Sequence, residues 1–410
     1  MNLISKEEFY KSVTYLTCYE LLHPWSKSCV KACLFMSLNT VKGGTKFFIP
    51  IYLCKIIINK NKLSKRYLLL QFRCYIRSVI YATLYATFFM TSMCTCRHLC
   101  GQFFYYNVAF LGGFFGGASI FIESEFNKTL TTVLWVNLCI ETMIRYLEAY
   151  GILKPNKLFF GVSFMVSCSL MTHLMMEHDP SKKFLKLWFF TPNTTDLKQM
   201  EKVKQCFHKD SCTNYIFQGA YKYFLIGYLV QTLKTVLPRA GIILKQPLLL
   251  LQLLFRKNNF MMASFFGSFI AIFRAINCYY SGKKKPEVMG FLASTSYILK
   301  HDVTIAITSF TTTLQYLLHP LRQTLEEKYK IPYRELLFML CNGYLMHARF
   351  LHPDQCPQYV INMLKTTTNG AAENVFRNTL KWSTNKEYVK NYFFKIKENA
   401  LEKFYRKLNF

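Results

Sequence analysis

The sequence predicts an all-α protein, a polytopic bundle of membrane helices. Apolar runs with few charges approach the roughly 20 residues that a helix needs to cross a bilayer. Basic residues gather in short connectors between these runs, a pattern typical of membrane topology. Backbone polar groups in lipid must be hydrogen-bonded within the chain, so each run is expected to be helical.

The composition favours a membrane protein over a nucleic-acid-binding one. The 410 residues are 52% hydrophobic, and 51 Lys and Arg against 22 Asp and Glu give a net charge of +29. No nucleic-acid-binding motif accompanies this charge, so we expect anionic lipid headgroups, and no nucleic acid, as its partners. The 15 cysteines match no disulfide framework, and the charged start of the chain predicts no cleavable signal peptide.

Five segments follow one another along the chain. Two halves made of membrane helices are separated by a polar connector, and each end carries a further region. The predicted segments are a Cys-bearing N-terminal region (1–40), a first helix-bundle half (41–176), a basic polar connector (177–213), a second half with a glycine-rich helix (214–320), and a C-terminal helical, basic amphipathic tail (321–410).

The apolar runs predict six to eight membrane crossings. The expected spans are 47–58, 79–93, the glycine-rich run 105–123, 129–147, 158–176, 215–237, 260–280 and 288–318. Pro247 interrupts the short run 242–255, which we interpret as interfacial or re-entrant. Lys300-His301-Asp302 predicts a turn within the last run. The basic connector from Lys60 to Arg66 is expected in the cytosol.

Glycines at four-residue spacing mark the expected packing faces of two helices. Gly112 pairs with Gly116 and Gly113 with Gly117, inside an uncharged apolar run. Small residues four apart let two helix backbones approach closely in lipid. Gly267 stands in a similar Phe-rich context in the second half, and we assign it the same role.

The two halves also resemble each other in sequence. The stretch 43–53 is similar to 219–229, and 114–121 is similar to 265–272. Duplication would give a bundle of two related halves, an arrangement common among membrane transporters. Chance similarity among helices rich in Phe and Gly is the alternative.

Three polar residues lie within the fourth expected span. Asn137, Glu141 and Arg145 are spaced to share one helix face. Charged groups at membrane depth usually face a partner or a wet cavity. One interpretation is an ion pair within the helix on the polar side of a bundle, and the other is a lining for a solute or lipid headgroup.

No motif in the sequence predicts catalysis or a resident cofactor. Asp and Glu are sparse, the histidines are scattered, and no activated nucleophile is recognisable, so we expect a non-enzymatic protein. The cluster Cys94-Thr-Cys96-Arg-His98-Leu-Cys100 offers soft ligands, but its spacing matches no known zinc finger. We therefore interpret the cluster as structural and expect no metal site.

A set of motifs at the N-terminus and in the expected spans points to one protein family. At the N-terminus the residues are Cys18, Tyr19, Glu20, His23, Trp25 and Cys29, followed by Pro50, Tyr52 and Leu53. With these residues the chain resembles the transmembrane protein 135 family. Residues 137–145 follow the family's N-L-x-x-E-T-x-x-R pattern, 227–231 resemble its G-Y-L-[IV]-Q, and 259–269 continue the match. The resemblance covers about 18–318; the connector is shorter than usual, and the tail after 319 matches poorly.

The resemblance implies a multi-pass protein of mitochondrial and peroxisomal membranes that acts in organelle dynamics and lipid homeostasis. Its expected partners are the lipid bilayer, anionic lipids at the basic connectors and tail, a second copy of the chain, or organelle-division factors. The alternative function is a transporter or pore for a small metabolite or lipid, lined by the polar residues of the fourth span. The family supplies no catalytic residue for this chain.

Overall fold

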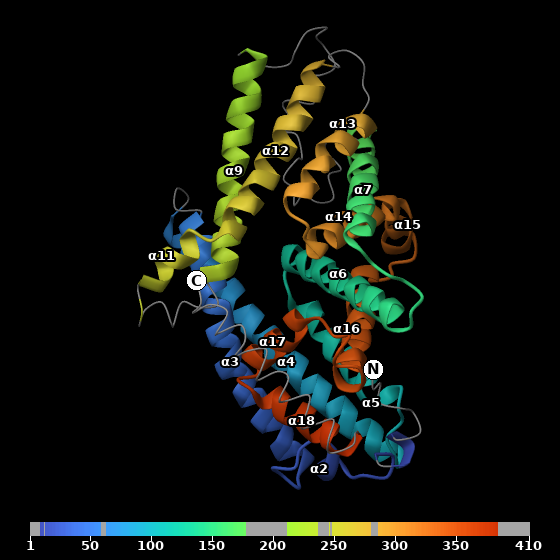
Figure 1. Cartoon of the computed structure of the whole chain (residues 1–410). Coiled ribbons are helices and arrows are strands. Elements are labelled where there is room, and N and C mark those ends of the chain that lie inside the picture. The colour runs from blue at the N-terminus through green and yellow to red at the C-terminus, as the bar shows by residue number, and fades with distance from the viewer. Residues whose placement is uncertain are drawn as a thin grey trace. The chain divides into compact units, whose positions relative to one another are not determined.

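The structure is a computed structural model that describes residues 9–11, 13–58, 63–177, 211–236, 246, 248–279 and 286–383. These residues form helices joined by short loops, without a strand among them, which confirms the predicted all-α fold (Figure 1). Most of the basic connector (178–210) and the end of the basic tail (384–410) lie outside the described residues.

The chain forms two compact units. The first unit comprises Met1–Ile152 and Lys330–Phe410, and the second unit comprises Leu153–Tyr329. The first unit is therefore built from two separate stretches of the chain, and the second unit is continuous. Each unit has its own buried apolar core.

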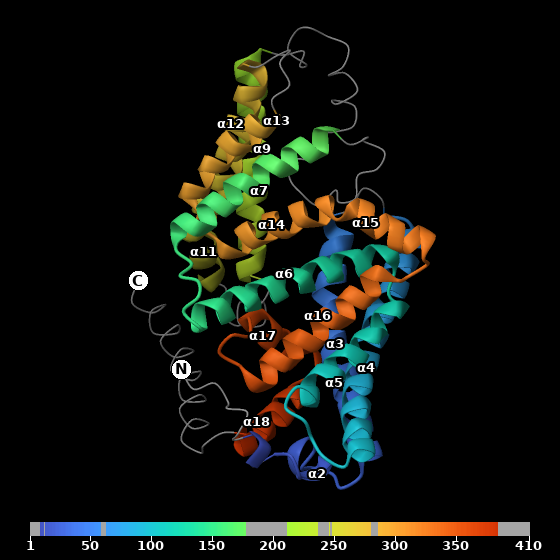
Figure 2. The ribbon, with the colours of Figure 1, turned by 90° about the vertical axis from the view of Figure 1, so that its right-hand side faces the viewer.

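The first unit contains long N-terminal helices and three C-terminal ones. In chain order its helices are α2 (Cys18–Leu21), α3 (Cys29–Ile58), α4 (Lys65–Cys100), α5 (Asn107–Gly117), the 3-10 helix η2 (Ala118–Ile122), α6 (Glu125–Ala149), α16 (Tyr333–Leu351), α17 (Gln358–Thr367) and α18 (Ala371–Ser383). Helix α16 packs against both α5 and α6, and Figure 2 shows it between them. The core gathers around α16, where Phe338 and Leu345 are fully buried.

Local signals in the sequence set the ends of these helices. The Ser64 hydroxyl accepts a hydrogen bond from the Tyr67 amide at 3.2 Å at the start of α4. Gly101 ends the helix in the left-handed region, with φ of 69°, which a glycine adopts without strain. The Ser124 hydroxyl caps α6 in the same way, because it accepts a hydrogen bond from the backbone amide of Asn127 at 3.4 Å.

The glycines of α5 face two different helices. A β-carbon added at Gly112 would lie 2.7 Å from the Met93 side chain, and one at Gly116 would lie 3.1 Å from the Tyr85 carbonyl, so this strip faces α4. The neighbouring strip, Gly113 and Gly117, lies against the α16 backbone instead, where added β-carbons would sit 2.6 and 2.9 Å from backbone atoms. Glycine thus allows α5 to pack tightly on two sides at once.

The second unit begins with α7 and ends with a short helical pair. Its described helices are α7 (Lys157–Glu177), α9 (Cys212–Val236), α11 (Leu248–Leu254), α12 (Lys257–Tyr279), α13 (Pro286–Ala293), the 3-10 helix η5 (Ser294–Leu299), α14 (Val303–Leu317), α15 (His319–Gln323) and the π-helix η6 (Thr324–Lys328). The predicted turn at 300–302 is present: the Asp302 carboxylate accepts from the Thr304 amide at 3.0 Å and caps α14.

Helices α9 and α12 pack closely along their length (Figure 1). A β-carbon at Gly227 of α9 would lie 2.8 Å from the Met262 carbonyl of α12. In the opposite direction, one at Gly267 of α12 would lie 3.1 Å from the Ala220 carbonyl of α9. Each helix therefore contributes a glycine where the other backbone comes closest.

Three stretches of the described residues are long and apolar enough to cross a membrane: 65–100 in α4, 157–174 in α7 and 248–279 in α11 and α12. The glycine-rich run is shorter than the expected membrane helix, because its apolar helix covers Val108–Ile122, where α5 continues directly into η2. At about 1.5 Å per residue in α5 and about 2.0 Å in η2 it extends roughly 26 Å, somewhat less than a hydrocarbon core. The six to eight crossings stay a prediction.

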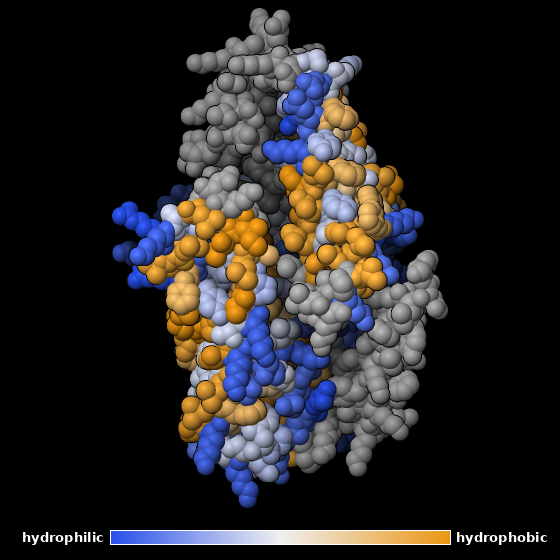
Figure 3. Space-filling view, turned by 90° about the vertical axis from the view of Figure 1, so that its left-hand side faces the viewer, coloured by the Kyte–Doolittle hydropathy of each residue, from blue (hydrophilic) through white to orange (hydrophobic). Residues whose placement is uncertain are grey.

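Large apolar side chains are exposed on the helices of both units. On α3, for example, Leu34, Leu38, Leu53 and Ile57 are each more than half exposed. The face drawn in Figure 3 carries broad hydrophobic areas interrupted by hydrophilic ones. Extended exposed apolar surface is unusual for a soluble monomer and agrees with contact to lipid.

Candidate functional site

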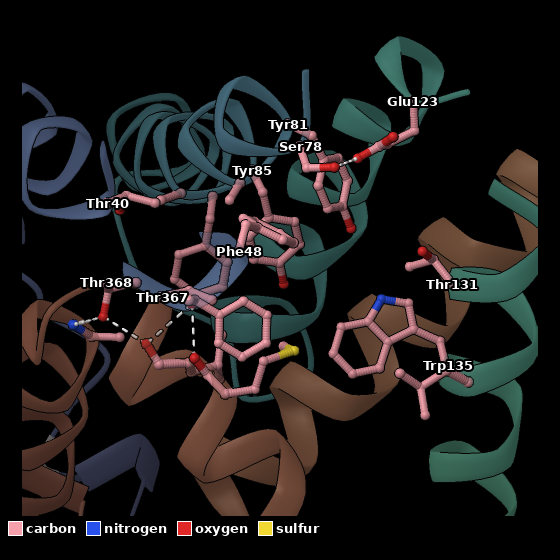
Figure 4. A pocket seen from close by; sticks show the side chains of 18 of the residues that line it. Thr40, Phe48, Ser78, Tyr81, Tyr85, Glu123, Thr131, Trp135, Thr367 and Thr368 are labelled. Atoms are coloured by element: carbon pink, nitrogen blue, oxygen red, sulfur yellow. Dashed lines mark hydrogen bonds between the residues drawn. The ribbon is translucent and has the colours of Figure 1, made fainter. Parts of the chain in front are cut away.

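The first unit contains a cavity of about 270 Å³ (Figure 4). Helices α3, α4, α6, α16, α17 and α18 provide its walls, together with Glu123 between η2 and α6. Apolar and aromatic side chains dominate the lining. They include Met36, Phe47, Phe48, Tyr81, Phe89, Leu134, Trp135, Met346, Phe350, Met363 and Val375.

One end of the cavity is polar and fully organised by hydrogen bonds. The buried Glu123 carboxylate accepts a hydrogen bond from the Ser78 hydroxyl at 2.8 Å and another from the side-chain amide of Asn127 at 2.9 Å. The Ser124 backbone N–H donates to the same carboxylate at 3.2 Å. Because the Ser78 hydroxyl donates its proton to Glu123, the Ser78 oxygen accepts a hydrogen bond from the Tyr52 hydroxyl at 2.9 Å. The site thus holds a buried carboxylate among three donors.

Tyr85 contributes a hydroxyl to the apolar part of the cavity. Its oxygen is buried and has no hydrogen-bond partner among the described residues. Figure 4 shows the Tyr85 ring directed into the cavity, beside Phe48. A buried hydroxyl without a partner costs about 1–3 kcal/mol, which a ligand with a polar atom at this position would recover.

Apolar side chains form an open rim between α3 and α6. Ile51, Leu130 and Leu134 line the cavity and are still 48%, 42% and 37% exposed. A rim of this kind favours entry of an apolar molecule, because no charged side chain in this group must be desolvated.

Size and lining together define what the cavity can hold. Its volume lies near the lower limit of small-molecule sites, at about 300 Å³, so it suits one acyl chain or a compact apolar molecule. The carboxylate at the polar end repels an anionic headgroup and accepts hydrogen bonds from a hydroxyl or amine. The geometry therefore fits a neutral or cationic amphipathic molecule better than a fatty-acid anion.

The polar residues predicted within the fourth span lie elsewhere on α6. Arg145 donates to Glu141 at 2.6 Å, as an i,i+4 pair whose side chains are 41% and 20% exposed. Neither they nor Asn137 line the cavity. The same helix contributes Asn127 and Trp135 to the cavity, and both lie nearer its N-terminus than Asn137, Glu141 and Arg145.

The N-terminal motif residues fall into two groups in the structure. The side chains of Cys18, His23 and Cys29 converge, and Cys94 from the end of α4 joins them. Glu20 instead completes the capping box of α2, where its carboxylate accepts from the Thr17 amide at 2.7 Å.

The remaining two motif residues lie at the periphery of this convergence. Trp25 packs on Phe35 with ring centroids 5.4 Å apart, and Tyr19 is exposed. Neither side chain belongs to the convergent group of Cys18, His23, Cys29 and Cys94.

The structure separates Cys94 from its neighbours in sequence. Cys96, His98 and Cys100, grouped with it by proximity along the chain, do not belong to the convergent group. A hydrogen bond with the Cys94 thiol lowers the pKa of Cys18 to about 5, an effect that burial opposes and His23 strengthens.

Sequence reasoning missed the polar end of the cavity. Tyr52 appeared only as part of a family motif, and Ser78 and Glu123 were not singled out. A usable signal was present, since Glu123 is an acidic residue directly after an apolar run and Ser78 lies just before another. What the sequence lacked was the fold that brings α3, α4 and α6 together.

No solved structure matches this chain. Residues 15–147 match the family model described as the N-terminal cysteine-rich region of Transmembrane protein 135. The matched stretch contains α2 to α5 and nearly all of α6. It therefore includes the convergent group of Cys18, His23, Cys29 and Cys94 and the polar end of the cavity. The match confirms the family resemblance predicted from the sequence over this part of the chain: residues 15–147 of this membrane protein are similar to the N-terminal cysteine-rich region of Transmembrane protein 135.

Proposed function

We propose that the protein is a non-enzymatic, multi-pass component of a mitochondrial or peroxisomal membrane that acts in membrane dynamics and lipid homeostasis. The family resemblance supports the organelle and the process. The amphipathic cavity of the first unit supports the mode of action, because it offers one lipid molecule a place within the protein.

The cavity is the observation that carries this proposal. Its wall is mostly aromatic and aliphatic, its rim is apolar, and one end contains a buried carboxylate with ordered donors. We propose that a neutral lipid enters with its apolar body against Phe48 and Trp135 and places a hydroxyl or amine near Glu123. Tyr85 supplies a second polar contact along the ligand.

The proposed partners follow from the same features. The bilayer surrounds the exposed apolar helices, and anionic headgroups bind the basic connectors. Self-association and recruitment of organelle-division factors are further proposals, which rest on the family resemblance. The alternative function, transport through a polar pathway on α6, has less support, since Glu141 and Arg145 pair with each other.

Photocrosslinking in a detergent-purified full chain tests lipid binding. The probes are a diazirine sterol, a diazirine monoacylglycerol and a diazirine fatty acid, each competed with its unlabelled parent. We expect labelling of α3, α4 or α6 peptides by a hydroxyl-bearing probe, and at least several-fold weaker labelling by the fatty acid.

Matched variants assign the labelling to this cavity. Ala82→Phe fills the cavity and should abolish labelling, and Glu123→Gln should weaken it. Glu141→Gln is the control, because it changes a carboxyl group on α6 outside the cavity. Labelling that Ala82→Phe leaves unchanged, in a protein with normal thermal unfolding, would contradict the proposal.

Cell experiments test the organelle role separately. In cells that lack the endogenous protein, the wild-type chain should restore organelle shape and lipid content, and Ala82→Phe should fail at equal abundance. Solute flux in liposomes that Glu141→Ala abolishes would instead favour the transporter.

A further inference from the structure

Four side chains with metal-binding atoms meet at the N-terminal end of the first unit. Cys18, His23, Cys29 and Cys94 each offer one ligand atom, and all four atoms lie within 4.8 Å of one another. Cys18 lies at the start of α2, His23 follows that helix, Cys29 begins α3, and Cys94 lies near the end of α4. Residues far apart in sequence thus form one compact set of three thiols and one imidazole.

The distances suit a tetrahedral metal ion. Zinc binds sulfur at about 2.3 Å and imidazole nitrogen at about 2.0–2.1 Å, so two ligands of one tetrahedral ion lie roughly 3.6–3.8 Å apart. The Cys94 sulfur and the His23 Nε2 are 3.6 Å apart. Small side-chain movements bring atoms that now lie within 4.8 Å onto such a tetrahedron.

The histidine is already oriented as a metal ligand. Its Nδ1 donates a hydrogen bond to the Ser26 carbonyl at 2.7 Å, which leaves Nε2 as the free acceptor that faces the thiols. A ligating histidine almost always makes such a bond through its other nitrogen. The turn itself is fixed, because the Ser26 amide donates to the His23 carbonyl at 3.0 Å.

Residues outside the convergent group fix the backbone around it by hydrogen bonds. The capping box of Thr17 and Glu20 fixes the start of α2 beside Cys18. Arg97 donates to the Leu16 carbonyl at 2.7 Å, and Asn378 of α18 donates to the Leu21 carbonyl at 2.8 Å. The ligands therefore stand on a supported frame, as a structural metal site requires.

A disulfide between two of the thiols is the competing explanation. All of the described cysteines are free thiols in the structure. A disulfide would use two sulfurs and leave the third thiol and the imidazole buried beside it without a function. The convergence of all four side chains, with the imidazole oriented by Ser26, is better explained by a metal ion.

We propose that Cys18, His23, Cys29 and Cys94 bind one zinc ion in a closed structural site. Binding displaces the protons that the thiols still carry and leaves three thiolates and a neutral imidazole on the ion, with a net charge of −1. With four protein ligands there is no open position for catalysis. The ion ties α2 and the start of α3 to the end of α4, next to the core of the first unit.

Metal analysis of the full chain tests the site. The protein is expressed with zinc, purified in detergent with a non-thiol reductant, and analysed by inductively coupled plasma mass spectrometry. We expect about one zinc per chain in the wild type. Cys18→Ser and His23→Ala should lose it, whereas His23→Cys should retain it as a four-thiolate site.

Two other cysteines provide matched controls on the same helices. Cys33 lies one turn after Cys29 on α3, and Cys96 lies two residues after Cys94 on α4. Neither belongs to the convergent group, so Cys33→Ser and Cys96→Ser should keep the full zinc content. Loss of zinc in these variants to the same extent as in Cys18→Ser would overturn the assignment.

Cobalt substitution of the wild type makes the test independent of folding defects. Chelated protein reloaded with Co²⁺ should show sulfur-to-cobalt charge transfer and the intense visible bands of a tetrahedral ion. Absence of zinc with Cys18, Cys29 and Cys94 all alkylatable overturns the proposal, and so does a disulfide among these three thiols in protein alkylated inside cells. Octahedral cobalt without charge transfer would do the same.

Discussion

Gly113 of α5 lies against the backbone of Asn342 in α16, so closely that a β-carbon at 113 would fall 2.6 Å from the Asn342 carbonyl oxygen. On the next strip of α5, a β-carbon at 112 would fall 2.7 Å from the flexible Met93 side chain. The two glycines are neighbours in sequence, but one faces a backbone that cannot yield and the other faces a side chain that can.

Gly113→Ala should therefore destabilise the protein more than Gly112→Ala does. Alanine raises helix propensity by about 1 kcal/mol at either position. At 113 the clash with α16 should outweigh this gain by about 1–3 kcal/mol, and at 112 the movement of Met93 should leave stability nearly unchanged. Thermal unfolding in detergent measures both; equal melting temperatures for the two variants would contradict the packing argument.

Arg349 of α16 and Glu373 of α18 form an ion pair in which Arg349 is buried and Glu373 is partly buried. Arg349 is 3% exposed, donates to Glu373 Oε2 at 3.0 Å, and lies 3.3 Å from the Phe376 ring centroid. Arg349→Met should cost up to about 3 kcal/mol, because it leaves a partly buried carboxylate without its partner. The double variant Arg349→Met/Glu373→Met should recover part of this loss in a double-mutant cycle; simple additivity would show that the pair is not coupled.

Two buried histidines should make the first unit sensitive to acid. Burial lowers the pKa of His347 to about 4, with the neighbouring His352 as a second cause, and burial also lowers the pKa of His352 to about 4. The unfolded chain takes up these protons near pH 6.5, so stability is fully present above about pH 7 and is lost as the pH falls toward 4.

Melting temperatures between about pH 7.5 and pH 5 measure this dependence. Each histidine contributes a slope of up to about 1.4 kcal/mol per pH unit. His347→Phe should reduce the slope, while His301→Gln, at an exposed position of the second unit, should leave it unchanged. A pH profile that His347→Phe does not alter would show that His347 takes up no proton on unfolding.

Extraction tests membrane integration directly. With apolar helices such as α4 long enough to cross a bilayer, the protein should stay in the membrane pellet after alkaline carbonate treatment. A peripheral protein of the same organelle serves as the control that must be released. Recovery of this chain in the supernatant would remove the basis for a multi-pass protein.

The sequence predicted the helices better than their partners. Apolar runs identified α4, α7 and α12, since length and hydropathy act locally. The spacing of Gly112, Gly113, Gly116 and Gly117 predicted close packing. That α5 packs against α16 could not be predicted, because this contact depends on residues more than 200 positions later.

The convergent group of Cys18, His23, Cys29 and Cys94 could not be predicted for the same reason, because its members are far apart in sequence. Cys94 was grouped with Cys96 and His98 by proximity in sequence, yet residues two apart on a helix point in different directions. Its neighbours in the structure, Cys18 and His23, were known only as parts of a family motif. The spacing of Cys18 and His23 ahead of Cys29, where α3 begins, was the available signal, but it did not identify Cys94 as the fourth residue.

The division of the first unit between two stretches of the chain has a consequence for biosynthesis. When residues 1–152 have left the ribosome, α16, α17 and α18 do not yet exist, and Leu153–Tyr329 must be translated first. During that interval the Gly113 strip has no partner and one wall of the cavity is missing. Nascent chains thus need protection from mispairing in the membrane, and a premature stop anywhere before α16 should abolish the first unit as well as the residues it removes.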